Sequence, residues 1–395
     1  MSRSIPAFPN PDMLVWARET SRLELGVAAA RLSVDEAQLL AWESGDPGLT
    51  VAKLQAVADL YRRPLASFYL SERPEVPERV RDYRRPWLTA RRRESPMLAA
   101  EIRRAEFQRD NVLEIMELRD EEPTHVWKEP ARFENVAARA RILLNKHALI
   151  ARPGQSGKPT DWFFYWSSAL EEMGVLVMTA NAVSAQEADG FSVALDPVPV
   201  VGVNGATHFN RRIFTLLHEY AHLLHNTSAL CDLHEESTGA DDVDRIEVEC
   251  NWLAAEILVP SAAFAQRPIV VSARANASDW QLWQLRDEAR AWGVSPEVIL
   301  RKLFTHGKAS QEFYENWRDE YNDTDRWSSG PEPRKANGGD GLRTKVRNLG
   351  KGYVRNVVSA MSEGLLSTYE TSNMLNAKVD QIPKLLDRAR VPEVD

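Results

Sequence analysis

The segment His218-Glu219-Tyr220-Ala221-His222 contains three side chains whose types and spacing could carry out hydrolytic chemistry. Two histidines four positions apart lie on one face of a helix, about one turn from each other. Two neutral imidazole nitrogens at that separation can bind one divalent metal ion. Glu219 follows the first histidine, where its carboxylate can take a proton from water as a general base. The flanking residues are apolar, so the helix is predicted to be buried, and a metal ion would satisfy polar groups that are costly to bury.

A catalytic zinc ion needs a third protein ligand besides these two histidines. The extended pattern H-E-x-x-H-x-x-G-x-x-H is absent, because His225 stands at its glycine and Ser228 at its last histidine. A helix predicted after an acidic loop offers a carboxylate instead, since Glu247 falls beside the apolar stripe of that helix. Glu249 is the alternative ligand, although it is predicted to lie with Glu256 on the opposite, solvated side.

Several neighbouring residues could assist such a site. Asn251 follows Glu247 by one turn and is well placed to hydrogen bond to a metal-binding histidine. The residue that would stabilise an oxyanion is left open among four candidates, which are Tyr220, His208, His225 and Arg211. The two cysteines, Cys231 and Cys250, are expected to be inert buried thiols, with a redox switch or an extra metal contact as the alternative.

The elements around the histidine pair predict a small sheet packed on helices. Residues 174–178 (GVLVM) have the β-branched composition of a strand. Two further apolar runs, 190–195 and 198–203, flank Asp196-Pro197 and predict a β-hairpin. A substrate strand is predicted to add to the sheet edge near 198–203. Most of the remaining chain has helical patterning, so the expected fold class is mainly α with a small β-sheet, an α+β fold.

The first 75 residues predict several short helices in a compact all-α domain. Ser33 and Glu36 form a capping-box pattern that predicts the start of a helix ending at Glu43. With the preceding helix, 25–32, this makes a helix-turn-helix whose second helix would enter the major groove of DNA. The candidate DNA contacts are Gln38 for a base and Arg18, Arg22 and Arg31 for phosphates. Acidic residues on the second helix oppose binding to phosphates, so docking of a protein is the alternative.

Composition bounds the class of protein. The chain has 395 residues and a formal net charge of −8, which disfavours a general polyanion binder. With two cysteines it has no disulfide scaffold, and a reducing compartment is expected. No signal peptide and no membrane-spanning run is recognised. We therefore expect a cytoplasmic protein with no membrane partner.

Four segments carry a resemblance to a known family. They are FTLLHEYAHLLH (214–225), IE-x-x-CN-x-x-AAE-x-LVP (246–260), GFSVALDPVPVVGVNG (190–205) and RDYRRP (81–86). In these segments the sequence resembles the ImmA/IrrE family of HExxH metallopeptidases, in its longer members with an N-terminal Xre-type helix-turn-helix domain. The resemblance implies a zinc ion (Zn²⁺) held by His218, His222 and Glu247, with Glu219 as the catalytic base. This ligand set agrees with the helical phase of Glu247.

The resemblance also suggests names for the segments into which the chain divides. We expect an Xre-type helix-turn-helix domain at 1–75, an Arg-rich linker and helix at 76–130, and a minimal zincin-like metallopeptidase domain at 131–265. A helical extension at 266–327, a flexible linker at 328–341 and a small helical tail at 342–395 complete the expected organisation.

Two functions are compatible with these observations. The first is a cytosolic, regulatory zinc metalloendopeptidase that cleaves a specific protein such as a transcriptional repressor, an idea that rests on the family analogy. The second is a DNA-binding transcriptional regulator or antitoxin-like protein in which the zinc fold is structural or sensory. Glu219 favours the peptidase, because a purely structural site needs no base beside its ligand.

Overall fold

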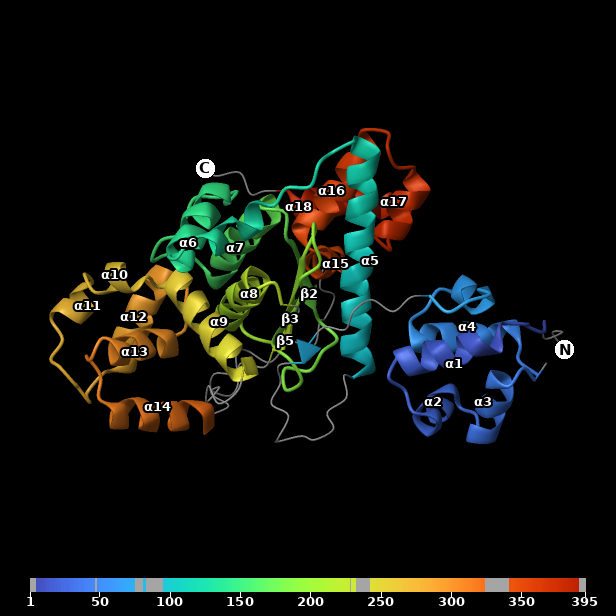
Figure 1. The fold of residues 1–395 in the computed structure, drawn as a ribbon, viewed down its shortest axis with the longest axis horizontal. Coiled ribbons are helices and arrows are strands. Elements are labelled where there is room, and N and C mark those ends of the chain that lie inside the picture. The colour runs from blue at the N-terminus through green and yellow to red at the C-terminus, as the bar shows by residue number, and fades with distance from the viewer. Residues whose placement is uncertain are drawn as a thin grey trace. The chain divides into compact units, whose positions relative to one another are not determined.

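The computed structural model describes residues 5–46, 48–74, 81–82, 95–227, 229–231, 242–323 and 341–390. In these parts helices predominate around one small sheet, which confirms the predicted α+β class (Figure 1). The chain divides into two compact units. Unit 1 comprises Met1–Arg79 and Arg85–Arg104, and unit 2 comprises Val80–Arg84 and Ala105–Asp395. Within the described ranges no helix is both long enough and apolar enough to cross a membrane.

Unit 1 is a helical unit with its own core. Its elements are α1 (Pro11–Thr20), α2 (Leu25–Leu32), α3 (Glu36–Glu43), α4 (Val51–Tyr61) and the 3-10 helix η1 (Leu65–Tyr69), followed by the first residues, 96–104, of α5 (Pro96–Arg119). The core includes the buried aromatic residues Trp16, Trp42, Tyr61 and Phe68. Burial of these large side chains is what stabilises helices as short as α2 and α3, which would be marginal alone.

The start of α3 differs from the prediction. Ser33 is not an N-cap: its φ of 55° is left-handed, and its N–H ends α2 by donating to Ala29 and Ala30 carbonyls. Asp35 caps α3 instead, since its carboxylate accepts the Gln38 N–H at 2.7 Å. The serine was misassigned because both residues are good caps and only the backbone conformation of the turn decides between them.

Unit 2 is built around a five-stranded sheet of order β1-β5-β3-β4-β2. The strands are β1 (Arg81–Asp82), β2 (Leu176–Ala180), β3 (Gly190–Val193), β4 (Val200–Asn204) and β5 (Ala229–Cys231). β3 and β4 are antiparallel, which confirms the predicted hairpin, and β2 runs parallel to β4. The predicted docking edge near 198–203 is wrong, because β4 is hydrogen-bonded on both sides. The edges of the sheet are β1 and β2.

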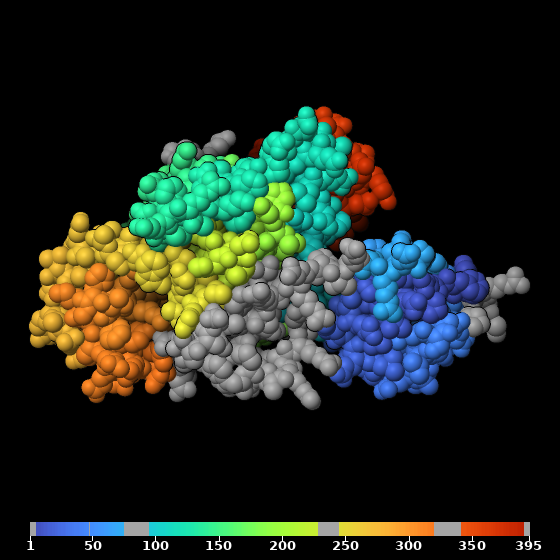
Figure 2. Space-filling view, viewed as in Figure 1, coloured from blue at the N-terminus to red at the C-terminus, as the bar shows by residue number. Residues whose placement is uncertain are grey.

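On the face of unit 2 that Figure 2 shows, most of the coloured surface belongs to helices. Before the motif helix they are η2 (Val126–Arg132), α6 (Val136–His147) and α7 (Pro159–Glu172). The motif helix is α8 (Phe209–Leu224), followed by α9 (Asp242–Leu258), α10 (Ser261–Phe264), α11 (Pro268–Val271), α12 (Leu282–Trp292), α13 (Pro296–Thr305) and α14 (Gln311–Asp323). The tail folds into α15 (Gly341–Leu349), α16 (Lys351–Ser362), α17 (Thr368–Met374), the 3-10 helix η3 (Val379–Gln381) and α18 (Ile382–Ala389).

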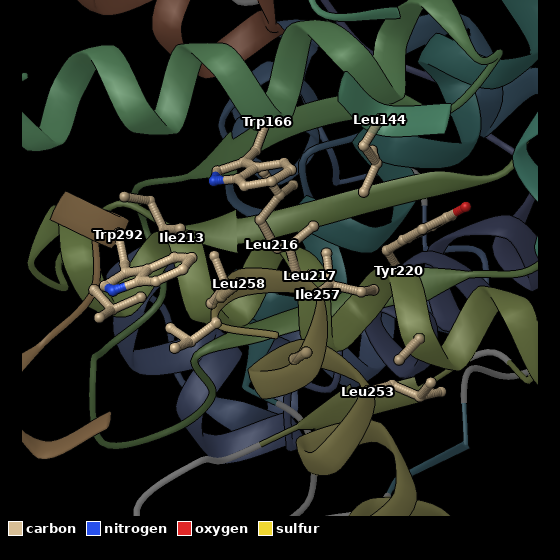
Figure 3. Packing of buried hydrophobic residues seen from close by; sticks show 14 of the residues in the cluster. Leu144, Trp166, Ile213, Leu216, Leu217, Tyr220, Leu253, Ile257, Leu258 and Trp292 are labelled. Atoms are coloured by element: carbon tan, nitrogen blue, oxygen red, sulfur yellow. The ribbon is translucent and has the colours of Figure 1, made fainter. Parts of the chain in front are cut away.

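The two faces of the sheet belong to two different cores. On one face Val201 and Val203 of β4 pack with α8, in a core that includes Trp166 and Leu217 (Figure 3). On the other face Val198 packs with the second part of α5 and with the tail helices. Because neighbouring strand residues point to opposite faces, a continuous apolar run such as 198–203 can serve both cores.

The tail is an integral part of unit 2. The side-chain amide of Gln108 donates to the Leu349 carbonyl at 3.1 Å, and the Asn111 amide donates to the Tyr353 hydroxyl at 2.7 Å. Tyr353 is fully buried and lies in the core shared by α5 and the tail. The sequence predicted small helices here, but it gave no sign of where they pack.

Candidate metal centre

The helix that carries the histidine pair is held in place by burial along most of its length. α8 has no glycine or proline, and twelve of its residues are buried, including His218, Glu219 and His222. It ends at His225, and Asn226 follows in the left-handed conformation with φ 54°, a common way of ending a helix. The packing of α8 between the sheet and α9 therefore fixes the histidines from two sides.

The structure brings His218, His222 and Glu247 together. One ligand atom from each lies within 4.8 Å of the other two, and all three side chains are buried. Glu247 Oε2 is 3.3 Å from His218 Nε2, and its Oε1 is 3.1 Å from His222 Nε2. The two Nε2 atoms are 3.1 Å apart. Two imidazoles and one carboxylate from two adjacent helices are a donor set that suits a divalent metal ion.

Thr227, which sequence reasoning did not single out, orients His222. Its hydroxyl donates to the His222 carbonyl at 3.1 Å, and the same oxygen is 3.3 Å from His222 Nδ1. Because the hydroxyl proton is committed to the carbonyl, Nδ1 must be the donor of the second bond. This selects the tautomer whose Nε2 lone pair points at the cluster, as a metal ligand requires. The only sequence signal is a threonine just after the end of the helix.

The electrostatics of the cluster also suit a cation. Burial is the main reason that the pKa of His222 is lowered to about 4, so this imidazole is neutral at pH 7. Burial opposes protonation of His218 as well, but Glu247 hydrogen bonds to it and the pKa of His218 is raised. Although burial alone would raise the pKa of Glu247, its hydrogen bonds to both histidines hold it well below the usual range. The ionised carboxylate of Glu247 therefore brings a negative charge to the triad, which suits a bound cation.

Glu219 lies fully buried against the start of β3. A Cβ atom on Gly190 would be only 3.0 Å from Glu219 Oε1, so the carboxylate packs directly over the glycine backbone. The same Cβ would be 2.5 Å from Thr215 Cγ2. A glycine at 190 is therefore what permits β3 to approach α8 this closely. The sequence alone does not indicate that this glycine lies against Glu219 and Thr215 of α8.

The remaining neighbours separate into inner and outer residues. Asn251 forms a side-chain hydrogen bond that helps to raise the pKa of His218, on the side predicted for it. Glu249 points outward: its side chain is 57% exposed and it pairs with His225, Nε2 to Oε2, at 3.7 Å. Of the two carboxylates considered as the third ligand, the structure thus places only Glu247 at the histidines.

The oxyanion candidates are engaged elsewhere or lie at the surface. Tyr220 points into the core and its hydroxyl donates to the Trp127 carbonyl at 2.8 Å (Figure 3). Arg211 forms a two-pronged ion pair with the fully buried Asp189, at 2.5 and 2.6 Å. His208 is exposed at the start of α8. Tyr220 and Arg211 therefore hold α8 in position, against η2 and against the residue preceding β3.

Of the other groups considered from the sequence, Cys250 and Glu256 take no part in the metal centre. Cys250 is fully buried, and burial raises the pKa of its thiol, which makes it an inert apolar side chain at neutral pH. The side chain of Cys231 lies outside the described residues, so its expected burial stays a prediction. Glu256 is not on a solvated face, contrary to expectation. It accepts the Lys302 ammonium at 2.6 Å and the Ser261 N–H at 2.6 Å, because α10 and α13 fold back on that side of α9.

In unit 1 the predicted DNA contacts have different surroundings. Gln38 and Arg31 are exposed and Arg22 is half-buried. Arg18 is enclosed, since its guanidinium pairs with Glu43 at 2.7 and 3.0 Å. This hydrogen-bonded pair, which raises the pKa of Arg18, ties α1 to α3 and gives Arg18 a structural role.

Comparison with known proteins agrees with the geometry. Residues 170–304 match a family model of peptidases, described as the IrrE N-terminal-like domain. The matched range contains all four residues of the motif and triad, and it supports the ImmA/IrrE family and a metallopeptidase-like domain for this part of the chain. No curated protein and no solved structure matches the chain.

Proposed function

We propose that the protein is a zinc-dependent metalloendopeptidase of the cytoplasm with a regulatory role, cleaving a specific protein such as a transcriptional repressor. The observation that carries the proposal is the buried triad of His218, His222 and Glu247, with Glu219 one residue after the first ligand. A site that only stabilised the fold would have no need of this fourth polar group in an apolar helix.

The triad fits zinc by its donor chemistry. Zinc takes imidazole nitrogen and carboxylate oxygen in tetrahedral sites, and three protein ligands leave one position for a reacting group. When bound, the ion would supply Lewis acidity and lower the pKa of water. Glu219 would receive the proton of the attacking water and hand it to the leaving amine, as a general base and then a general acid.

Metal content tests the ligand set. We expect about one zinc per chain in the wild type and a large loss in Glu247→Gln, measured by elemental analysis after dialysis. The matched control is Glu249→Gln, which removes an exposed carboxylate two positions away on the same helix. Equal zinc in the two variants would contradict the assignment of Glu247.

Cleavage tests the role of Glu219. The zinc-loaded wild type is incubated with a cytoplasmic extract, and new peptide termini are identified by mass spectrometry. Glu219→Gln is expected to keep zinc and to lose cleavage by a factor of about 10²–10⁴, the usual contribution of a general base. Termini that appear equally with this variant would rule out peptidase chemistry at the triad.

We also propose that α2 and α3 form an Xre-type helix-turn-helix that binds DNA. The function that competes with the peptidase is then that of a DNA-binding transcriptional regulator or antitoxin-like protein. The order of the two helices and the exposed Gln38 support this assignment, while the acids of α3 oppose it. Selection of binding sequences from a random DNA pool distinguishes the functions. A regulator should retain its site in Glu219→Gln, whereas failure to enrich any sequence favours a protein-docking module.

A further inference from the structure

A cationic pocket of about 540 Å³ lies at the start of α7, away from the metal centre. Its wall is formed by the loop before α7, by α12 and by the first residue of α13. None of its lining residues belongs to the triad. Asn210, the lining residue on α8, precedes His218 by eight positions, which is about 12 Å along the helix axis. The proposed peptidase chemistry therefore makes no use of this pocket.

The charged residues that line the pocket are all basic. Lys158, Arg286 and Arg290 line it, and no acid is among its lining residues, all of which the structure describes. Two acids adjoin lining residues in the sequence or in space: Asp287 accepts a hydrogen bond from the Gln155 amide at 3.0 Å, and Asp161 accepts one from the Lys158 N–H at 3.0 Å. Basic side chains that line one hollow attract an anion.

A buried hydrogen-bond donor adds an independent indication of a ligand. Trp162 lines the pocket and is 1% exposed, yet among the described residues its indole N–H has no hydrogen-bond acceptor. Buried donors are nearly always satisfied in folded proteins. A Cβ atom on Gly157 would be 3.3 Å from Trp162 Nε1, and one on Gly293 would be 2.4 Å from Trp162 Cγ. Both glycines line the pocket, so the backbone is kept bare on either side of the indole.

We propose that this pocket binds a small molecule bearing a phosphate group. Phosphate oxygens accept hydrogen bonds and carry negative charge, so they match a pocket lined by an indole N–H donor, a lysine and two arginines. The volume is in the range of pockets for small ligands. A pocket of about 540 Å³ has room for a phosphate ester or a nucleotide and not for the extended backbone of DNA. The ligand would connect the loop before α7 with α12 and thus brace the helices that surround α8.

Calorimetric titration of the full chain at low ionic strength tests this proposal, with phosphate, pyrophosphate and ATP as probes. We expect saturable binding of pyrophosphate that weakens about tenfold in the double variant Lys158→Gln, Arg290→Gln, because two charge contacts are lost. The matched control is Arg274→Gln, Lys384→Gln, which removes the same charges from exposed positions outside the pocket. Tighter binding of ATP than of pyrophosphate would identify a nucleotide, and equal binding a simpler phosphate ester.

The indole resonance of Trp162 gives a second measurement. In protein labelled with ¹⁵N-tryptophan, its signal is assigned by its absence in Trp162→Phe. Pyrophosphate should move this signal downfield as the N–H gains an acceptor. The proposal is wrong if binding does not saturate, if the pocket variant and the control bind equally, or if other indole signals move while that of Trp162 does not. None of these measurements needs zinc or cleavage, so they are independent of the proposed peptidase activity.

Discussion

Replacing Gly190 with alanine tests how closely β3 must approach the motif helix. The added methyl carbon would lie 2.5 Å from Thr215 Cγ2 and 3.0 Å from both Glu219 Oε1 and the Gly202 carbonyl oxygen. Carbon atoms in ordinary contact stay about 3.5–4.0 Å apart, so strand and helix would have to separate by about 1 Å. Neither can move freely, because β3 is hydrogen-bonded on both sides and Thr215 is fully buried.

Overpacking of this kind costs about 1–3 kcal/mol. We expect Gly190→Ala to lower the free energy of unfolding by about 2 kcal/mol, which is about a thirtyfold change in the unfolding equilibrium constant. The methyl also displaces the Glu219 carboxylate, so proteolytic activity should fall further than the loss of folded protein explains. Urea unfolding followed by circular dichroism measures the first effect, and cleavage per folded molecule the second.

The structure offers both a rescue and a control for this substitution. Thr215→Ser removes the clashing methyl group but keeps the hydroxyl, which donates to the Arg211 carbonyl at 3.0 Å. The double variant should therefore regain part of the stability lost by Gly190→Ala. Gly154→Ala is the control, since a Cβ there meets nothing within 4 Å. If Gly190→Ala is as stable as Gly154→Ala, or if Thr215→Ser recovers nothing, the close packing described for β3 is refuted.

Three further results are expected. Burial alone would raise the pKa of Glu256, but hydrogen bonds from Lys302 and Ser261 hold it below its usual value. The pairing of Glu256 with Lys302 therefore stabilises the fold fully above the unfolded pKa of about 4.3, and this stabilisation is lost as the pH falls through the folded pKa. Unfolding of Lys302→Met should approach that of the wild type at acid pH, and a constant difference from pH 7 to 3 would contradict the pairing. Tyr220→Phe should cost about 1 kcal/mol through its lost bond to Trp127 while zinc content and cleavage per folded molecule stay unchanged; a selective loss of cleavage would restore its candidacy as an oxyanion stabiliser. Chelation of zinc should lower the melting temperature of the wild type but not of Glu247→Gln, in scanning calorimetry.

The parts of the site that sequence could predict are those fixed by helical periodicity. His218 and His222 share a face because they are four residues apart, and Glu247 was found from its phase on the next amphipathic helix. The hairpin could be predicted too, since its two strands are adjacent in the chain. In each case the pattern itself lies within one helix or between two strands that are adjacent in the chain.

The parts that could not be predicted depend on contacts between distant segments. β5 has three residues and β1 two, too few to show periodicity, and both exist through pairing with β3 or with each other. Glu256 was placed in solvent because nothing local indicates Lys302, 46 residues later. The contact of Gly190 is equally distant in the chain, because its neighbour Glu219 belongs to another element. A single glycine in a strand does not indicate which side chain will pack against it.

The docking of the tail on α5 has a consequence for how the protein is made. Gln108 and Leu349, which hydrogen bond to each other, are separated by 241 positions. At about 5–20 residues per second, the ribosome needs about 10–50 s to synthesise that stretch. During this interval the apolar face of α5 lacks the tail helices that pack on it, and exposed apolar surface of this kind is what chaperones bind. The nascent chain thus passes through a long stage in which one face of its sheet is bare, and any stop codon before the tail would leave the protein in it.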